Sequence, residues 1–333
     1  MEENNKKPTL LLSSIAGLLA GMVLATAAFA FGYLHYVIGL RDYDPIKDPI
    51  AIEKDLSGLD VPSNMKAGMG IPVLQDKEIT NILIIGSDTR DPNANGRSDA
   101  MMLLTINKKT RSFHLTSLMR AIYVSIPNDP DPAYSKNWQA NYMLNAAHTW
   151  GGPRLLMKTV QRNFRVEVSR YVATDFSGFE KAIDAIGGVT IDLTAAEAKY
   201  LNSLEGRSLK AGPQLLMGKT ALNYSRIRKI DSDFKRMERQ RKVIKALFDK
   251  LLASDPGTLT KTVESIMPMI KTNLTDGEMM AMVMNVGSYR NYSFDQLMLP
   301  LETYKAMKTI KKMEMYDIDW TENINRLHAF MKS

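Results

Sequence analysis

The chain has 333 residues, of which 45% are hydrophobic and 24% are charged, and its formal net charge is +7. This composition is too apolar for an intrinsically disordered chain, and the length is sufficient for a sizeable hydrophobic core. The absence of cysteine excludes disulfides, thiolate metal sites and a cysteine nucleophile. The basic balance favours an anionic partner: a phosphate-rich substrate, an anionic lipid or a nucleic acid.

The first forty residues contain a long apolar segment, with no Asp, Glu, Lys or Arg between Pro8 and Leu40. A helix of about 20 such residues spans the hydrocarbon core of a bilayer. A cleaved signal peptide is the alternative, with Ala28-Phe29-Ala30 as its cleavage site, but the apolar run continues beyond that point. Lys6 and Lys7 favour a cytoplasmic N-terminus. We therefore predict a cytoplasmic tail over residues 1–7, a single transmembrane anchor over 8–40, and an extracytoplasmic remainder held at the cell membrane.

The remainder is expected to form a stalk and one domain. Asp, Pro and Gly residues are frequent over 41–77, which predicts a stalk. A domain is expected over 78–255, with 256–333 as a helical and strand extension of it. The continuous apolar run at 81–86 predicts a strand buried on both faces. Other strands are expected at 101–106, 113–118, 123–126, 171–174 and 189–193. Helices are expected at 140–164, interrupted at 151–153, at 175–186 and at 236–252. This order favours an α/β or α+β domain around one sheet.

A polar cluster follows the first predicted strand, with Asp88 and Arg90 close behind it and Arg97 and Asp99 soon after. Ligands of α/β proteins bind at the carboxyl ends of strands. Two aspartates can hold Mg²⁺, and guanidinium groups bind phosphate oxygens through paired hydrogen bonds. A polar loop with surface ion pairs is the alternative interpretation.

Further cationic residues lie downstream. Arg120 follows a predicted strand, and Arg226 and Arg228 would share a face if their segment is extended. On a helix, Arg236, Arg239 and Gln240 would share a face through their i, i+3 and i+4 spacing. A solvated helix face would explain the last group equally well.

Taken together, these segments resemble the LytR–CpsA–Psr family of cell-wall glycopolymer ligases. The resemblance runs from about Thr80 to Leu252, through NILIIGSDTR, RSDAMMLLTI, HLTSLMR, LNAAHTWGGP, VATDFSGFEKAIDAIGGVTIDL, GKTALNYSRIR and DFKRMERQRKVI. It implies a single α/β/α domain around a central mixed sheet. It also implies a Mg²⁺-dependent phosphotransferase that moves an anionic glycopolymer, such as teichoic acid or capsule, from a polyprenyl-pyrophosphate carrier to a muramic-acid hydroxyl of peptidoglycan.

The resemblance assigns roles to individual residues. Asp88 and Asp99 would bind Mg²⁺ and, with Arg120, form the catalytic group. An apolar pocket would hold the polyprenyl tail, with the pyrophosphate at its mouth. The residues implied to contact the pyrophosphate are Arg97, Arg120, Arg226, Arg228, Arg236 and Gln240, together with Arg90 and Arg239 in matching motifs.

One position departs from the family pattern. Members usually have Asp directly after the arginine that aligns with Arg120, whereas this chain has Ala121. That carboxylate could orient an arginine, assist the metal or accept the proton of the acceptor. The substitution favours the alternative of a non-catalytic membrane protein that binds polyprenyl pyrophosphate. A nucleic-acid partner is not expected, because no recognition-helix motif accompanies the basic charge.

Overall fold

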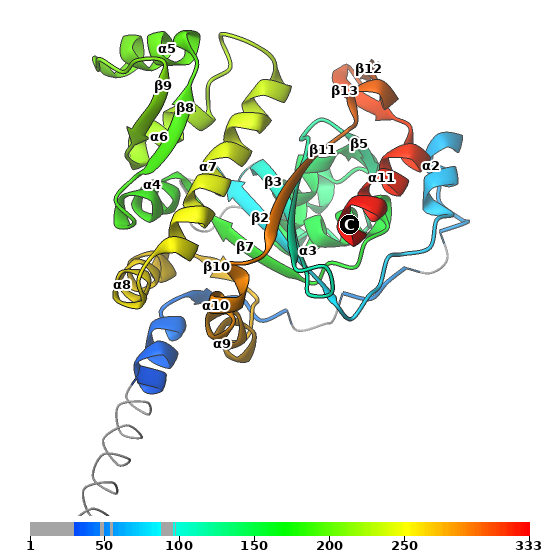
Figure 1. Ribbon diagram of the computed structural model, residues 1–333. Helices are drawn as coiled ribbons and strands as arrows, with labels where there is room; N and C mark the ends of the chain where they lie inside the picture. Colours follow the sequence, from blue (N-terminus) through cyan, green and yellow to red (C-terminus); the bar gives the residue numbers. More distant parts are fainter. Residues whose placement is uncertain (1–29, 47–49, 54–55, 88–95, 97) are drawn as a thin grey trace, which may run out of the picture.

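A seven-stranded mixed sheet forms the centre of the computed structural model, which describes residues 30–46, 50–53, 56–87, 96 and 98–333 (Figure 1). Its order is β1 (Asp42–Tyr43), β10 (Lys271–Thr272), β7 (Arg170–Thr174), β2 (Ile79–Ser87), β3 (Ser98–Asn107), β4 (Ser112–Leu118) and β11 (Ser293–Leu299). The β2–β3, β3–β4 and β7–β10 pairs are antiparallel, and the β2–β7, β4–β11 and β1–β10 pairs are parallel. The predicted single α/β domain around a mixed sheet is confirmed.

Helices cover both faces of this sheet (Figure 1). On one face, Leu83 and Ile85 of β2 pack in a core with α2 (Ser63–Met69), α3 (Leu144–Phe164) and α11 (Trp320–Lys332). On the other face, Ile82 packs with α7 (Asp233–Ala253), α9 (Asp276–Met284) and α10 (Val286–Tyr289). Because alternate side chains of a strand point to opposite faces, a strand covered on both sides has a continuous apolar sequence. The predicted strand at 81–86 is thus confirmed.

A smaller lobe carries its own hydrophobic core beside the sheet. It contains α4 (Phe176–Ala185), the hairpin of β8 (Val189–Leu193) and β9 (Gly212–Leu216), α5 (Ala195–Glu205) and α6 (Gly218–Ser225). Val243 of α7 is fully buried in the core of this lobe, while Met237 of the same helix belongs to the main core. Helix α7 therefore fixes the lobe against the sheet.

The helix expected at 140–164 begins later than predicted. Residues Asn141–Met143 form β6, which pairs with β5 (Tyr123–Ser125), and α3 starts at Leu144. The expected interruption is present, because Gly151 and Gly152 leave helical geometry and Gly152 has a φ of 60°. The remaining elements are η1 (Pro132–Asn137), α8 (Pro256–Ile266), η2 (Met267–Met269), η3 (Glu302–Tyr304), β12 (Lys305–Ile310) and β13 (Met313–Ile318).

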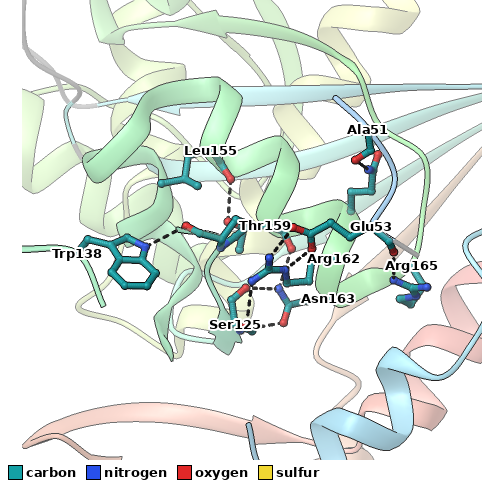
Figure 2. A network of polar contacts seen from close by, with 11 residues as sticks. Ala51, Glu53, Ser125, Trp138, Leu155, Thr159, Arg162, Asn163 and Arg165 are labelled. Atoms are coloured by element: carbon teal, nitrogen blue, oxygen red, sulfur yellow. Dashed lines mark hydrogen bonds and ion pairs between the residues drawn. The ribbon is translucent and has the colours of Figure 1, made fainter. Parts of the chain in front are cut away.

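Residues 41–77 were expected to form a stalk, and this prediction is wrong for their described part. Strand β1 joins the central sheet, and Met65 of α2 is buried in the main core. Figure 2 shows Arg162 of α3 donating from Nε and Nη2 to the Glu53 carboxylate, both at 2.5 Å. Gln161 also donates to the Ala51 carbonyl at 2.9 Å. A polar residue of this segment, Glu53, and the Ala51 carbonyl thus accept hydrogen bonds from buried side chains of α3, contacts that the composition of the segment does not reveal.

The predicted anchor lies mostly outside the described residues. Residues 30–39 are helical, and among the helices that the structure describes none is both long and apolar enough to cross a bilayer. The end of this short helix is packed on the domain: Val37 and Ile38 are fully buried, and Tyr33 donates to Glu264 of α8 at 2.7 Å.

Replacing Glu53 with Gln should destabilise the fold, because the buried Arg162 would lose its charged acceptor. We expect a loss of about 1–3 kcal/mol in the free energy of unfolding, measured by urea unfolding of the purified chain. Glu302→Gln is the matched control, since that side chain is 84% exposed. Equal stability of the two variants would show that the charge of Glu53 contributes nothing to the fold.

Candidate functional site

A narrow cavity of about 90 Å³ lies between the sheet and α7. Its apolar wall residues come from the sheet and α7, with Ile84 of β2, Met102 of β3 and Ile244 of α7, and from the smaller lobe, with Phe179 of α4 and Leu222 of α6. The polar side chains at its mouth include Asp99, Arg226, Arg228, Arg236 and Gln240, and Thr174, Asp175 and Ser225 line the cavity as well. The cavity therefore has an apolar interior and a cationic mouth.

Four different elements position the residues of this mouth. Asp99 lies at the start of β3, opposite a register shift at the end of β2. Arg120 follows β4, and Arg226 is the C-cap residue of α6. Arg236 and Gln240 lie one turn apart on α7, as the helical spacing predicts. Arg228 lies in the loop between α6 and α7, so the segment 224–228 is not extended, which was the condition for its two arginines to share a face; both arginines nevertheless line the cavity.

Two carboxylates connect the arginines. Arg120 donates from Nη1 to Asp99 Oδ1 at 2.7 Å, and Nη2 of Arg228 lies 3.7 Å from the same oxygen. Asp233, the first residue of α7, lies 3.6 Å from Arg120 and 2.8 Å from Arg236. Asp233 was missed as a site residue. The only sequence signal for it was its place at the start of the Arg-rich helix.

The cationic charge of this cluster exceeds its anionic charge. Arg236 is only 2% exposed, and its pKa is lowered to about 10, first by burial and then by the neighbouring charge of Arg120. Within the described part of the chain, Nε of Arg236 and Nε of Arg120 are buried without a hydrogen-bond acceptor. A buried donor without an acceptor is costly unless a ligand satisfies it. The site is therefore suited to an anion.

Arg239 does not join this cluster, so the prediction that it shares a face with Arg236 and Gln240 is wrong. Its guanidinium is buried and donates to Glu197 at 2.7 Å, to Asp231, and to the Ile227 carbonyl at 3.1 Å. Burial alone would raise the pKa of Glu197, but hydrogen bonds from Thr194 and Arg239 lower it overall. Arg239 thus fixes α7 to α5 and to the loop that carries Arg228.

Only one of the two predicted metal ligands, Asp99, lies within the described residues. Asp88, Arg90 and Arg97 lie outside the described residues. Among the residues described, no group of three or more potential metal ligands was found. Asp99 receives Arg120 and approaches Arg228 through Oδ1. Its Oδ2 is therefore the atom suited to a cation, and a single carboxylate fits Mg²⁺ only if phosphate oxygens and further ligands complete the shell.

The structure also shows what surrounds Ala121. Its carbonyl accepts a hydrogen bond from the Tyr316 amide of β13 at 2.8 Å. Asp129, one of the nearest acidic residues in sequence, is held instead by Arg154 and Lys158. Asp233 is thus the described residue that brings a second carboxylate to Arg120.

A second apolar cavity, of about 240 Å³, continues along the same face of the sheet. Ile82 and Leu104 line it from the sheet, and Phe248 lines it from α7. Leu34 and Val37 of the helix at 30–39 line its far side. Ile82 and Ile84 are two residues apart on β2, so their side chains point to the same face of the sheet. Both cavities therefore lie between this face and α7.

Comparisons with known proteins agree on one family. A transferase named TagU, polyisoprenyl-teichoic acid–peptidoglycan teichoic acid transferase, from Oceanobacillus iheyensis is 34% identical over 260 residues, covering 77% of this chain and 76% of that protein. A TagU of Bacillus mycoides is 27% identical over 327 residues, covering 96% of both chains.

Solved structures share the fold. The structure described as LytR-CPS2A-psr family protein YwtF (TagT) with bound octaprenyl pyrophosphate lipid superposes with a TM-score of 0.58 at 21% identity, covering 78% of this chain and 94% of that one. The family model LytR_cpsA_psr matches residues 47–331, well beyond the segments whose motifs carried the resemblance. The chain belongs to the LytR–CpsA–Psr family.

Proposed function

We propose that this chain is a membrane-anchored, Mg²⁺-dependent phosphotransferase that moves an anionic glycopolymer from a polyprenyl-pyrophosphate carrier to a muramic-acid hydroxyl of peptidoglycan. The observation that carries the proposal is the cluster of incompletely paired arginines at the mouth of an apolar cavity. The names of the TagU relatives, which describe transfer of teichoic acid to peptidoglycan, support the substrate class.

The net positive charge of the cluster suits a pyrophosphate. Arg120, Arg226, Arg228 and Arg236 contribute four positive charges, and Asp99, Asp233 and Asp175, which also lines the cavity, contribute three negative charges. The described residues therefore leave an excess of positive charge, which attracts a pyrophosphate diester with about two negative charges. Guanidinium groups bind phosphate oxygens in pairs, which also orients the ligand.

The two apolar cavities match the lipid tail. From Arg236 to Leu252, α7 is about 24 Å long at 1.5 Å per residue, and it covers both cavities. An isoprenoid lying beneath it would leave water along its length. The far cavity is lined by Leu34 and Val37, directly after the predicted anchor. The anchor would thus place this end of the cavity at the outer surface of the membrane, where the carrier resides.

Catalysis requires no covalent enzyme intermediate. The acceptor hydroxyl attacks the phosphorus that bears the glycan, a new P–O bond forms, the P–O–P bond breaks, and polyprenyl phosphate leaves. The hydroxyl proton passes to a carboxylate or to water. Arg228 and Arg236 hold the pyrophosphate and stabilise the charge that develops on the leaving group. Mg²⁺, held by Asp99 and Asp88, would supply further charge stabilisation. Asp233 positions Arg120 and Arg236.

The second candidate is a membrane protein that binds the lipid without transferring its glycan. Ala121 favours it, because the usual carboxylate is missing. Against it, Arg120 still has two carboxylate partners in Asp99 and Asp233. Tight lipid binding without any transfer, with transfer gained in Ala121→Asp, would select this candidate.

Replacing Arg236 with Gln should weaken binding of polyprenyl pyrophosphate by about tenfold or more, because a buried donor to the phosphates is lost. The unfolding free energy should stay within about 1 kcal/mol or rise, since a poorly paired buried charge is removed. Arg239→Gln is the matched control on the same helix: it should cost about 3–5 kcal/mol of stability, because Glu197 loses its partner. If Arg236→Gln instead unfolds the chain and Arg239→Gln does not, the assignment of the two arginines is reversed.

Replacing Asp99 with Asn should reduce transfer of glycan to peptidoglycan oligomers by about 100-fold or more, because Arg120 loses its charged partner and Mg²⁺ loses a ligand. The rate of product formation should rise with Mg²⁺ concentration in the unsubstituted chain and respond weakly in the variant. Asp129→Asn is the control, since that carboxylate lies outside the cluster. Unchanged turnover in Asp99→Asn would refute the proposed chemistry.

A further inference from the structure

Helices α9 and α10 carry an apolar outer surface. The chain has no charged residue between Glu278 and Arg290, a stretch that includes most of α9 and all of α10. None of the nine residues of α9, all of which the structure describes, is buried. Met284, its last residue, is 74% exposed. A surface helix of a globular domain normally turns charged or polar residues outward, so an apolar helix without buried residues is expected to contact another apolar body.

One side of α9 packs on the domain. Met279 and Met282 pack partly against the core on this face of the sheet, and Val283 lines the far cavity of about 240 Å³. Met284 belongs to neither group. Successive residues of a helix point about 100° apart, so the side chain of Met284 leaves α9 in a different direction from that of Val283. The outward side of α9 therefore exposes a large apolar side chain to the surroundings of the domain.

The predicted membrane anchor ends beside this surface. Residues 8–29 contain no charged residue, and the helix at 30–39 follows them. Leu34 of that helix lines the same cavity as Met282 of α9. Figure 1 shows the helix at 30–39 at the same end of the molecule as α9 and α10. The apolar chain that precedes residue 30 therefore joins the domain next to α9.

Ion pairs hold the acidic residues at the start of α9. Asp276 accepts from Arg41 at 2.5 Å, and Glu278 accepts from Arg170 at 2.7 Å. Charged groups that approach an apolar phase cost least free energy when they are paired. Arg41 directly follows the predicted anchor and also donates to the Leu274 carbonyl at 3.1 Å, so it ties the end of the anchor to α9.

Resting on the membrane anchor of the proposed function, we infer that residues 279–289 form a second membrane contact, which places Met284 among the acyl chains of the outer leaflet. Helix α9 is about 14 Å long at 1.5 Å per residue, which is too short to span a bilayer, so it lies at the interface. Tyr36 of the neighbouring helix is 59% exposed, and tyrosine is enriched at the level of the lipid headgroups. An anchor alone leaves the domain free to tilt, whereas two contacts determine which face of the domain meets the bilayer.

A second copy of the chain is the alternative partner for this surface. Stable protein interfaces use about 20–30 residues on each side. The stretch from 279 to 289 has fewer residues, and some of them line the far cavity. The anchor would hold a bilayer directly beside α9, so no second chain is needed to cover Met284. These two observations favour lipid.

The test uses the absence of cysteine, because a single introduced cysteine can be labelled selectively. The full chain with Met284→Cys, carrying a bimane fluorophore, is reconstituted in vesicles of phosphatidylglycerol and phosphatidylcholine. The vesicles are prepared with and without a phospholipid that bears a nitroxide on its acyl chain. The nitroxide should quench most of the fluorescence, because contact quenching requires the fluorophore to reach the acyl chains.

Two further variants are the controls. Met307→Cys is the matched control, because Met307 is a 48% exposed methionine of β12, which Figure 1 shows far from α9. Its fluorescence should be unchanged by the nitroxide. Ala20→Cys lies within the predicted anchor and should be quenched.

The other outcomes contradict the inference in distinguishable ways. Quenching in Ala20→Cys, with Met284→Cys quenched no more than Met307→Cys, would exclude the second contact and leave the proposed function standing. Shielding of the Met284→Cys label that needs no nitroxide lipid and grows with the number of chains per vesicle would assign the surface to a second copy. Absence of quenching in both Ala20→Cys and Met284→Cys would overturn the membrane anchor of the proposed function together with the inference.

Discussion

The burial of Arg236 among other guanidinium groups is the constraint on which the site depends. A cation that is 2% exposed would normally be paired with a carboxylate and fully hydrogen-bonded. Here the described carboxylates, Asp99 and Asp233, are shared with Arg120 and Arg228, and part of the donor capacity is left over. The fold maintains this imbalance because α7 is fixed on both sides, by the main core and by the ion pairs of Arg239.

The architecture around this cluster offers separate spaces for the apolar part and the charged part of an amphiphilic ligand. The sheet and α7 enclose the apolar cavities, and the end of β4, the end of α6, the α6–α7 loop and α7 bring arginines to the mouth. The smaller lobe adds an open cleft beside these arginines. Each part alone has an ordinary explanation, since apolar cavities and surface arginines are common. Here the arginine cluster adjoins one apolar cavity, and the second apolar cavity is lined by the helix at 30–39. This arrangement favours a membrane-borne pyrophosphate lipid over a soluble phosphate compound.

Much of the sheet was predictable from the sequence, because strands buried on both faces have long apolar runs. The strands at 81–86, 101–106 and 113–118 are of this kind. Strands β1 and β10 have two residues each, which is too short for any periodic signal. The prediction of a stalk at 41–77 is wrong because this segment packs on the domain through tertiary contacts that composition does not reveal, such as those of Glu53 and the Ala51 carbonyl with α3.

The candidate site was predictable as a set of residue types, and less so as a geometry. Arg236 and Gln240 were placed correctly because helical spacing determines which side chains share a face. Arg239 does not follow this prediction because its guanidinium group is bound by Glu197, 42 residues earlier in the chain. The most direct test of the account is the structure of the chain with polyprenyl pyrophosphate bound. The account predicts phosphates within hydrogen-bond distance of Arg228 and Arg236 and a tail between the sheet and α7. Lipid bound elsewhere, with these guanidinium groups untouched, would contradict it.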